Sequence, residues 1–408
     1  MLLLAFSGVL LVAVLVSSLA HRTILSTAVL FLVAGFLLGD GVLGVISIGE
    51  GDDSVSVLAE LALFAVLFTD GMRVGWQDLR QAYALPGRAL LVGLPLTLLA
   101  TALFAKFIVG LDWPESLLLG AVLAPTDPVF ASALVGNDKV PRRLRHLLNV
   151  ESGVNDGLAL PFVVVLLAVS QGAKDLHAPV LARELVVGIL IGIVVPYVAI
   201  KLEQTRLFKV SARYEPLNAV AIGLLVLALA KVIDGNLFLA AFAAGITVAT
   251  VGQAQRESFE EFGELIAEIL KLAALLVFGV LITPTFIGEI SLGGWVFAVL
   301  AIFVARPLAL ALSFVGAKLN MREQAAAMWF GPKGFASVVY GLLVLDSGIP
   351  EGDLLFHLIA ITIVMSIILH SSTDVLVARW FDEDRETPHW HDPVRRAVRG
   401  RRQPSSDS

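Results

Sequence analysis

The stretch Asn149-Val-Glu-Ser-Gly-Val-Asn-Asp-Gly-Leu-Ala-Leu-Pro161 places two carboxylates, a hydroxyl and an amide inside a strongly apolar sequence. These polar groups belong to Glu151, Ser152, Asn155 and Asp156. On a helix, residues four apart share a face, so the four side chains form two adjacent polar rows. Polar and charged groups are expensive in hydrocarbon, and where they occur they normally face the bundle interior and mark a functional site.

The composition excludes an ordinary soluble globular protein. The 408 residues are 57% hydrophobic and only 16% charged, with a mean hydropathy of +0.87, whereas soluble domains carry about 25% charged residues. Continuous apolar runs of about 18–25 residues favour membrane helices over a β-barrel, whose strands alternate apolar and polar residues. The chain has no cysteine, which excludes disulfides, thiolate catalysis and cysteine-bound metals.

We therefore expect an all-α polytopic membrane protein of about thirteen transmembrane helices. The predicted spans are 2–20, 24–46, 54–72, 85–109, 114–136, 145–170, 178–202, 215–233, 237–252, 262–284, 292–316, 324–345 and 353–379. No basic residue precedes the first apolar run, so we expect a retained span rather than a cleaved signal peptide.

The distribution of basic residues predicts the orientation, because cytoplasmic loops are enriched in Lys and Arg. Most Lys and Arg residues fall in one alternate set of loops and in the C-terminal segment. The other loops hold only Lys106, Lys174, Arg183 and Lys231. We expect a multi-pass protein of the plasma membrane with its N-terminus outside and its C-terminus in the cytoplasm.

Residues 381–408 predict a short cytoplasmic, disordered tail because they are polar and rich in Arg and Pro. The basic cluster 395–402 has two interpretations, a solvated tail or a contact with anionic lipid head groups.

Several further ionisable residues fall at predicted membrane depth. They are Asp70, Asp127, Glu268, Lys271, Arg306 and Lys333. An ion pair that only joins helices is the structural alternative for each of them. For Asp70 this alternative is as good as a functional role, and Glu268 and Lys271, three apart, favour a pair on one helix.

Two spans carry helix-breaking residues. Pro125 and Pro128 in Ala124-Pro-Thr-Asp-Pro128 interrupt the fifth span, and Phe330-Gly-Pro-Lys-Gly-Phe335 interrupts the twelfth. Free backbone groups at this depth are tolerated only where they line a site or are buried in protein. Two inverted repeats, formed by spans 1–6 and 8–13, would make the breaks equivalent, and such paired breaks point to a transporter site. A simple proline kink is the alternative.

The polar side chains at these breaks suit an alkali cation, which takes hard oxygen ligands in place of water. A desolvated carboxylate also binds a proton more tightly, because desolvation disfavours its charged form. One site can therefore hold either a proton or a cation, but not both well. This competition is the minimal chemistry of an exchanger.

The motifs resemble those of the monovalent cation/proton antiporter family, in the NhaP-type branch that includes the eukaryotic sodium/proton exchangers. The resemblance rests on Ala124-Pro-Thr-Asp-Pro128 and Glu151-Ser-Gly-Val-Asn-Asp156. Weaker support comes from Phe68-Thr-Asp-Gly71, Val304-Ala-Arg-Pro307 and Gly331-Pro-Lys-Gly334.

The resemblance implies roles for individual residues. Asp156 would be the carboxylate that carries a proton and a cation in turn, and Asn155 would mark the branch regarded as electroneutral. Thr126, Ser152 and Glu151 would complete the alkali-cation site, with Asp127 at the helix crossing. Arg306 would pair with Glu151, and Lys333 and Asp70 would compensate charge.

The resemblance also implies a function and an architecture. We expect an antiporter that exchanges Na⁺, or alternatively K⁺ or Li⁺, for H⁺ in a 1:1 electroneutral cycle of alternating access. No cofactor, enzyme activity or nucleic-acid partner is expected. A homodimer would use dimerisation helices within 1–72 and 215–284, core helices within 85–170 and 292–379, and a linker helix 178–202, all inside a transmembrane domain 1–380.

One position departs from the family pattern, since many relatives have Arg where this chain has Lys333. Lysine is a point charge without the planar fork of guanidinium, and it loses its proton more readily when buried. Two roles are open for Lys333, a fixed counter-charge or a group that titrates.

Two other function classes, an aspartyl protease and a cation channel, share part of this pattern. Paired intramembrane aspartates suggest an aspartyl protease, but the sequence lacks a Gly-x-Gly-Asp element on a partner span. A cation channel also uses broken helices lined with oxygen, yet inverted breaks favour alternating access. A voltage-driven current would indicate the channel.

Overall fold

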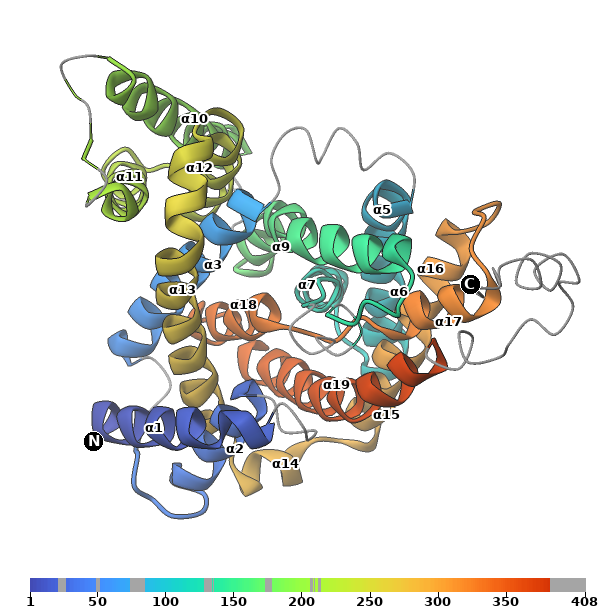
Figure 1. Ribbon diagram of the computed structural model, residues 1–408. Coiled ribbons are helices and arrows are strands. Elements are labelled where there is room, and N and C mark those ends of the chain that lie inside the picture. The colour runs from blue at the N-terminus through green and yellow to red at the C-terminus, as the bar shows by residue number, and fades with distance from the viewer. Residues whose placement is uncertain are drawn as a thin grey trace, which may run out of the picture.

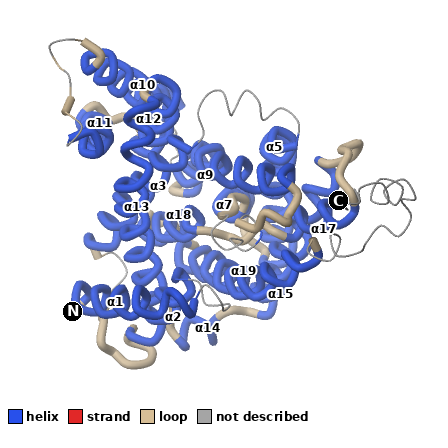
Figure 2. The backbone as a smooth tube through the Cα atoms, viewed as in Figure 1, coloured by secondary structure: helices blue, strands red, loops and turns tan. Residues whose placement is uncertain are grey.

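The computed structural model describes residues 1–20, 27–48, 52–73, 85–127, 134, 136–172, 178–205, 208, 210–211 and 214–381. Within these ranges the regular structure is helical, apart from an isolated β-bridge between Gly39 and Ile46 (Figure 2). Residues 382–408 of the expected tail 381–408, and Pro128 of the first break, lie outside the described residues.

The helices form two groups that lie side by side (Figure 1). The first group contains α1 (Leu2–Ala20), α2 (Thr27–Leu38), α3 (Asp53–Arg73), α10 (Ala178–Glu203), α11 (Glu215–Val232), α12 (Leu237–Val251) and α13 (Gln253–Leu281). The short α14 (Pro284–Glu289) leads into the second group.

The second group contains α5 (Leu85–Arg88), η1 (Ala89–Gly93), α6 (Leu94–Phe104), η2 (Ala105–Val109), α7 (Trp113–Leu123), α9 (Arg142–Ser170), α15 (Leu292–Leu300), η5 (Ala301–Ala305), α16 (Arg306–Ser313), α17 (Met321–Trp329), α18 (Phe335–Asp346) and α19 (Gly352–Trp380). Helices α3 and α13 of the first group pack against α18, and α3 also packs against α9. The site described below lies in this second group, beside the first.

Six helical stretches are long and apolar enough to cross a membrane by length and composition. They are Ser54–Arg73, Leu85–Val109, Arg142–Ser170, Pro179–Glu203, Leu292–Ser313 and Gly352–Trp380. Shorter apolar helices occupy other predicted spans, among them Leu237–Val251 and the two half-helices Trp113–Leu123 and Phe335–Asp346. The prediction of an all-helical, multi-span protein is confirmed, whereas the count of thirteen spans stays a prediction.

The second predicted span, 24–46, extends well beyond the end of its helix. Helix α2 ends at Leu38, and the chain turns back so that the amides of Val45 and Ile46 donate to the Leu38 carbonyl. The sequence Gly39-Asp-Gly41 explains the early end, because glycine favours turns over helix. The chain after Gly41 therefore folds back on the helix end through backbone hydrogen bonds instead of extending the helix.

Close glycine contacts hold the first group together. A Cβ atom on Gly71 of α3 or on Gly245 of α12 would overlap backbone atoms of the other helix. The same is true of Gly35 on α2 and Gly279 on α13. Small residues at a crossing let two helices approach backbone to backbone, which is how membrane helices associate without a hydrophobic driving force.

Two interruptions lie in the second group, as the proline and glycine pattern predicts. Helix α7 ends at Leu123, and residues 125–127 are irregular. Helix α17 ends at Trp329, and α18 begins at Phe335 after an irregular segment 330–334. Long helices α9 and α19 pass beside these breaks (Figure 1).

Candidate functional site

The two breaks are joined by hydrogen bonds. The amide of Asp127 donates to the carbonyl of Pro332 at 2.9 Å, and the amide of Phe335 donates to Oδ2 of Asp127 at 3.3 Å. Ser337 Oγ donates to the Val122 carbonyl at 2.7 Å, near the end of α7. The carboxylate of Asp127 thus accepts from the free amides at the start of α18, where a helix favours negative charge.

Glycines in the second break are required by this close approach. A Cβ atom on Gly334 would overlap the side chain of Asp127, and one on Gly331 would overlap the side chain of Arg306. The Gly-Pro-Lys-Gly sequence therefore does more than interrupt a helix. It leaves room for two charged side chains against the backbone.

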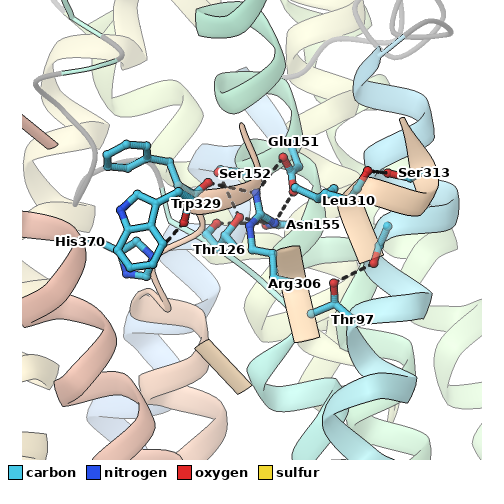
Figure 3. Close-up of polar contacts among 12 residues, drawn as sticks. Thr97, Thr126, Glu151, Ser152, Asn155, Arg306, Leu310, Ser313, Trp329 and His370 are labelled. Atoms are coloured by element: carbon cyan, nitrogen blue, oxygen red, sulfur yellow. Dashed lines mark hydrogen bonds and ion pairs between the residues drawn. The ribbon is translucent and has the colours of Figure 1, made fainter. Parts of the chain in front are cut away.

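A cluster of oxygen-bearing side chains joins the first break to α9 (Figure 3). Asn155 Nδ2 donates to Thr126 Oγ1 at 2.8 Å and to the Thr126 carbonyl at 3.3 Å, and Thr126 Oγ1 lies 3.3 Å from Ser152 Oγ. The carbonyl acceptor fixes which end of the amide faces Thr126. Asn155 Oδ1 is left buried without a hydrogen-bond partner among the described residues.

Asp156, the next residue on α9, is 6% exposed. Its backbone carbonyl accepts from the hydroxyl of Tyr340 at 2.9 Å, which ties α18 to α9. Within the described ranges no hydrogen bond or ion pair is made to its carboxylate. A buried carboxylate without a partner carries a large desolvation cost when it is charged.

Glu151, one turn earlier, has the opposite environment. Its two carboxylate oxygens accept from Arg306 Nη1 at 2.6 Å and Arg306 Nη2 at 3.2 Å, and both side chains are 5% exposed. Arg306 Nη2 also donates to the Phe330 carbonyl at 3.0 Å. The pair implied by the resemblance is present, and it connects α9, α16 and the second break.

Lys333 lies inside the second break with its side chain 2% exposed. Its backbone amide donates to Ser366 Oγ of α19 at 2.8 Å. The ammonium nitrogen has no hydrogen-bond partner among the residues the structure describes. The structure therefore places this cation at the crossing without pairing it directly with an acid.

Asp70 makes its ion pair on its own helix rather than with a residue of the oxygen cluster. It pairs with Arg73 at 3.5 Å and lines a cavity of about 420 Å³ between α3 and α13. Arg73 also contacts Glu264 at 3.2 Å across this cavity. The pair predicted between Glu268 and Lys271 is present at 3.6 Å and lines the same cavity.

Sequence reasoning missed several polar residues that shape the site. They are Ser337, Tyr340, Ser366 and His370, together with the pair of Arg143 and Glu323 that joins α9 to the start of α17. Ser366 and His370 carried a usable signal, since two polar residues four apart interrupt the apolar α19. Tyr340 and Ser337 carried none beyond lying in an apolar span.

The arrangement provides hard oxygen atoms rather than a transition-metal site. In the part of the chain that the structure describes, no three His, Asp or Glu side chains are grouped to hold a metal ion. Thr126, Ser152, Asn155 and Asp156 instead supply hydroxyl, amide and carboxylate oxygens beside two broken helices. Oxygen ligands of this kind are those that hard cations prefer.

Comparison with known proteins agrees with this geometry. Residues 9–380 match the family described as sodium/hydrogen exchanger, transmembrane. The chain is 28% identical over 374 residues to the K(+)/H(+) antiporter NhaP of Alkalimonas amylolytica, covering 90% of this chain and 64% of that protein. It is 26% identical over 375 residues to the K(+)/H(+) antiporter NhaP2 of Shewanella sp. (strain MR-4), covering 90% of this chain and 65% of the relative.

A solved structure has a similar fold. The sodium proton antiporter MjNhaP1 from Methanocaldococcus jannaschii matches with a TM-score of 0.76 at 18% identity, covering 93% of this chain and 99% of that one. The chain spans about two thirds of the length of the curated relatives it matches, 64–65%. The family predicted from the motifs is confirmed by this match. The match over residues 9–380 shows that the chain belongs to the sodium/hydrogen exchanger family.

Proposed function

We propose that this protein exchanges a monovalent cation for a proton across a membrane, with Asp156 binding each in turn. The proposal is carried by one observation: a buried carboxylate without a partner lies beside a cluster of oxygen atoms at two broken helices. Such a carboxylate is stabilised either by a proton or by a cation.

The cation would be bound by Asp156 with oxygen atoms of Thr126, Ser152 and Asn155. Asn155 Oδ1 supports this role because it is buried and without a partner, while its Nδ2 is used to hold Thr126. Glu151 was also expected as a ligand, and this remains a prediction. Its pairing with Arg306 instead favours a bracing role for Glu151.

Coupling follows from the cost of moving a bare charge. A charged and empty Asp156 would be expensive to carry between the two sides, because no described side chain compensates it directly. Only the protonated and cation-bound forms would cross. Since Asn155 is neutral, one cation would replace one proton, and the cycle would be electroneutral.

The test is transport in vesicles that contain the purified protein. An imposed pH gradient should dissipate when Na⁺, K⁺ or Li⁺ is added, without a membrane current. The apparent cation KM should rise as the pH falls, because protons and cations compete for Asp156. A voltage-driven cation current, or cation flux that is independent of pH, would refute the exchange mechanism.

Na⁺, K⁺ and Li⁺ are the candidates for the transported ion. The curated relatives are named K(+)/H(+) antiporters, and the solved structure is described as a sodium proton antiporter. We propose Na⁺ as the substrate, with K⁺ as the alternative. Rates for the three ions, measured against pH in one vesicle preparation, decide the order.

We further propose thirteen spans in two inverted repeats, with the N-terminus outside the plasma membrane and the C-terminus in the cytoplasm. The hydrogen bond between Asp127 and Pro332 supports the repeats, because it joins the two breaks that the repeats would make equivalent. The helices within 85–170 and 292–379 would form a moving core. Those within 1–72 and 215–284 would form the interface of a homodimer, with 178–202 as the linker.

The sequence offers a direct test of this topology. The chain contains no cysteine, so single cysteines placed in loops report their side by labelling with an impermeant reagent. A cysteine at Gln171 and one at Arg142, both exposed, lie at the two ends of the same helix and should be labelled from opposite sides. Labelling of both from one side would refute the span assigned to α9.

A further inference from the structure

The second break depends on backbone groups that α17 and α18 leave free. The irregular segment 330–334 lies between helices, so most of its carbonyls and amides lack partners in the flanking helices; the exceptions are the Phe330 amide and the Gly334 carbonyl. Residues of the site already described bind three groups at this break: the carbonyls of Phe330 and Pro332 and the amide of Phe335. Two further contacts, to the Trp329 carbonyl and the Lys333 amide, come from α19.

Ser366 and His370 of α19 bind the two ends of this segment. His370 Nε2 lies 3.0 Å from the Trp329 carbonyl at the end of α17, and Ser366 Oγ accepts from the Lys333 amide at 2.8 Å. The two residues are four apart and lie on one face of α19. Ser366 is 0% exposed and His370 is 2% exposed, so bulk water does not reach these contacts.

The acceptor at Trp329 fixes a proton on His370 Nε2. The Trp329 carbonyl only accepts, so His370 Nε2 must carry a proton and donate it. Ser366 Oγ accepts from Lys333 and has its own proton to give, and His370 Nδ1 lies 3.1 Å away. Nδ1 also lies 2.7 Å from the Ser366 carbonyl, which would accept if Nδ1 were protonated as well. In both cases the contact with Trp329 is kept.

We propose that Ser366 and His370 are positioning residues that fix the geometry of the second break and, through it, the cation site. The path is short. Ser366 holds the amide of Lys333, the neighbouring Pro332 carbonyl accepts from the Asp127 amide, and Thr126 precedes Asp127 in the oxygen cluster. This inference deepens the proposed function and rests on it.

The experiment compares four variants in the vesicle assay. His370→Leu removes the donor to Trp329, and Ser366→Ala removes the acceptor for Lys333. His370→Gln keeps an amide donor and should rescue. Thr362→Val is the matched control, because Thr362 is buried on the same helix and bonds only its own helix at the Leu358 carbonyl.

We expect His370→Leu and Ser366→Ala to raise the apparent cation KM about tenfold, the effect of one buried hydrogen bond lost. His370→Gln should lie within about threefold of the wild type, and Thr362→Val should be unchanged. A merely structural role would lower the amount of active protein, and hence the maximal rate, while the KM stayed constant. Ser366→Ala carries the test if His370→Leu does not fold.

A wild-type KM in both Ser366→Ala and His370→Leu would overturn the inference, and so would a His370→Gln variant as impaired as His370→Leu. These outcomes leave the proposed function standing, because the wild type would still exchange. Absence of exchange in the wild type would instead refute the proposed function.

Discussion

Two carboxylates on α9, five residues apart, have opposite surroundings. Glu151 gives both oxygens to Arg306 and is fixed by it, whereas the Asp156 carboxylate has no such partner among the described residues. Both are buried to nearly the same degree, at 4% and 6% exposure. Burial alone therefore does not separate a structural acid from a functional one. The partner does.

This difference gives the two carboxylates of α9 different roles. A buried carboxylate that is paired with guanidinium on both oxygens has its charge compensated and has no need of a proton or cation. The carboxylate without a partner is the one that can gain by binding either. The following variants test this division, starting with the largest expected effect.

Asp156→Asn should abolish exchange while the protein still folds and inserts. The amide is similar in size to the carboxylate but binds neither a proton nor a cation with a compensating charge. Dissipation of a pH gradient in vesicles measures the loss, and the melting temperature in detergent checks the fold. Exchange at the wild-type rate in this variant would refute the assignment.

Glu151→Gln should mainly destabilise the protein, by about 3–5 kcal/mol, because it leaves Arg306 buried and charged without its partner. The melting temperature in detergent measures this effect. The double variant Glu151→Gln with Arg306→Met removes both charges and should recover part of the loss. If the single variant melts like the wild type and loses only transport, Glu151 belongs to the cation site after all.

Asn155→Asp should change the stoichiometry rather than the fold. A second carboxylate beside Asp156 would carry an additional proton, so that transport moves net charge. Current recorded from the reconstituted variant, absent in the wild type, measures the change. An electrically silent variant with normal exchange would show that position 155 does not set the stoichiometry.

Ser152→Ala should have the smallest effect, about fivefold in apparent cation KM, since it removes one hydroxyl among several oxygen atoms and costs about 1 kcal/mol. Ser170→Ala is the control on the same helix, because Ser170 is buried there and its hydroxyl has no partner among the described residues. An equal shift in both variants would remove Ser152 from the site.

The fold was largely predictable from apolar run length. Helix α9, for example, was expected at 145–170 and spans Arg142–Ser170. The end of α2 was not predicted, because the turn at Gly39 and Asp40 takes up only a few residues between two apolar stretches. The division of helices into core and dimerisation groups remains a prediction.

The candidate site was predictable where the polar residues are unusual for a membrane. Thr126, Ser152 and Asn155 were expected together and lie in hydrogen-bond contact. The contacts of Ser366 and His370 were not foreseen, because which backbone groups a broken helix exposes depends on the path of the chain through the break. Spacing along a sequence does not specify that path.

The glycine contacts in the first helical group bear on where the protein can deform. Gly71 and Gly245 place α3 and α12 backbone to backbone, and Gly35 and Gly279 do the same for α2 and α13. Sliding of α3 along α12, or of α2 along α13, would bring main-chain atoms of the two helices into steric overlap. Relative movement of helices is therefore directed away from these seams, to the boundary with α9 and α18. Replacing Gly245 with a larger residue would separate α3 from α12 without changing a residue of the candidate cation site.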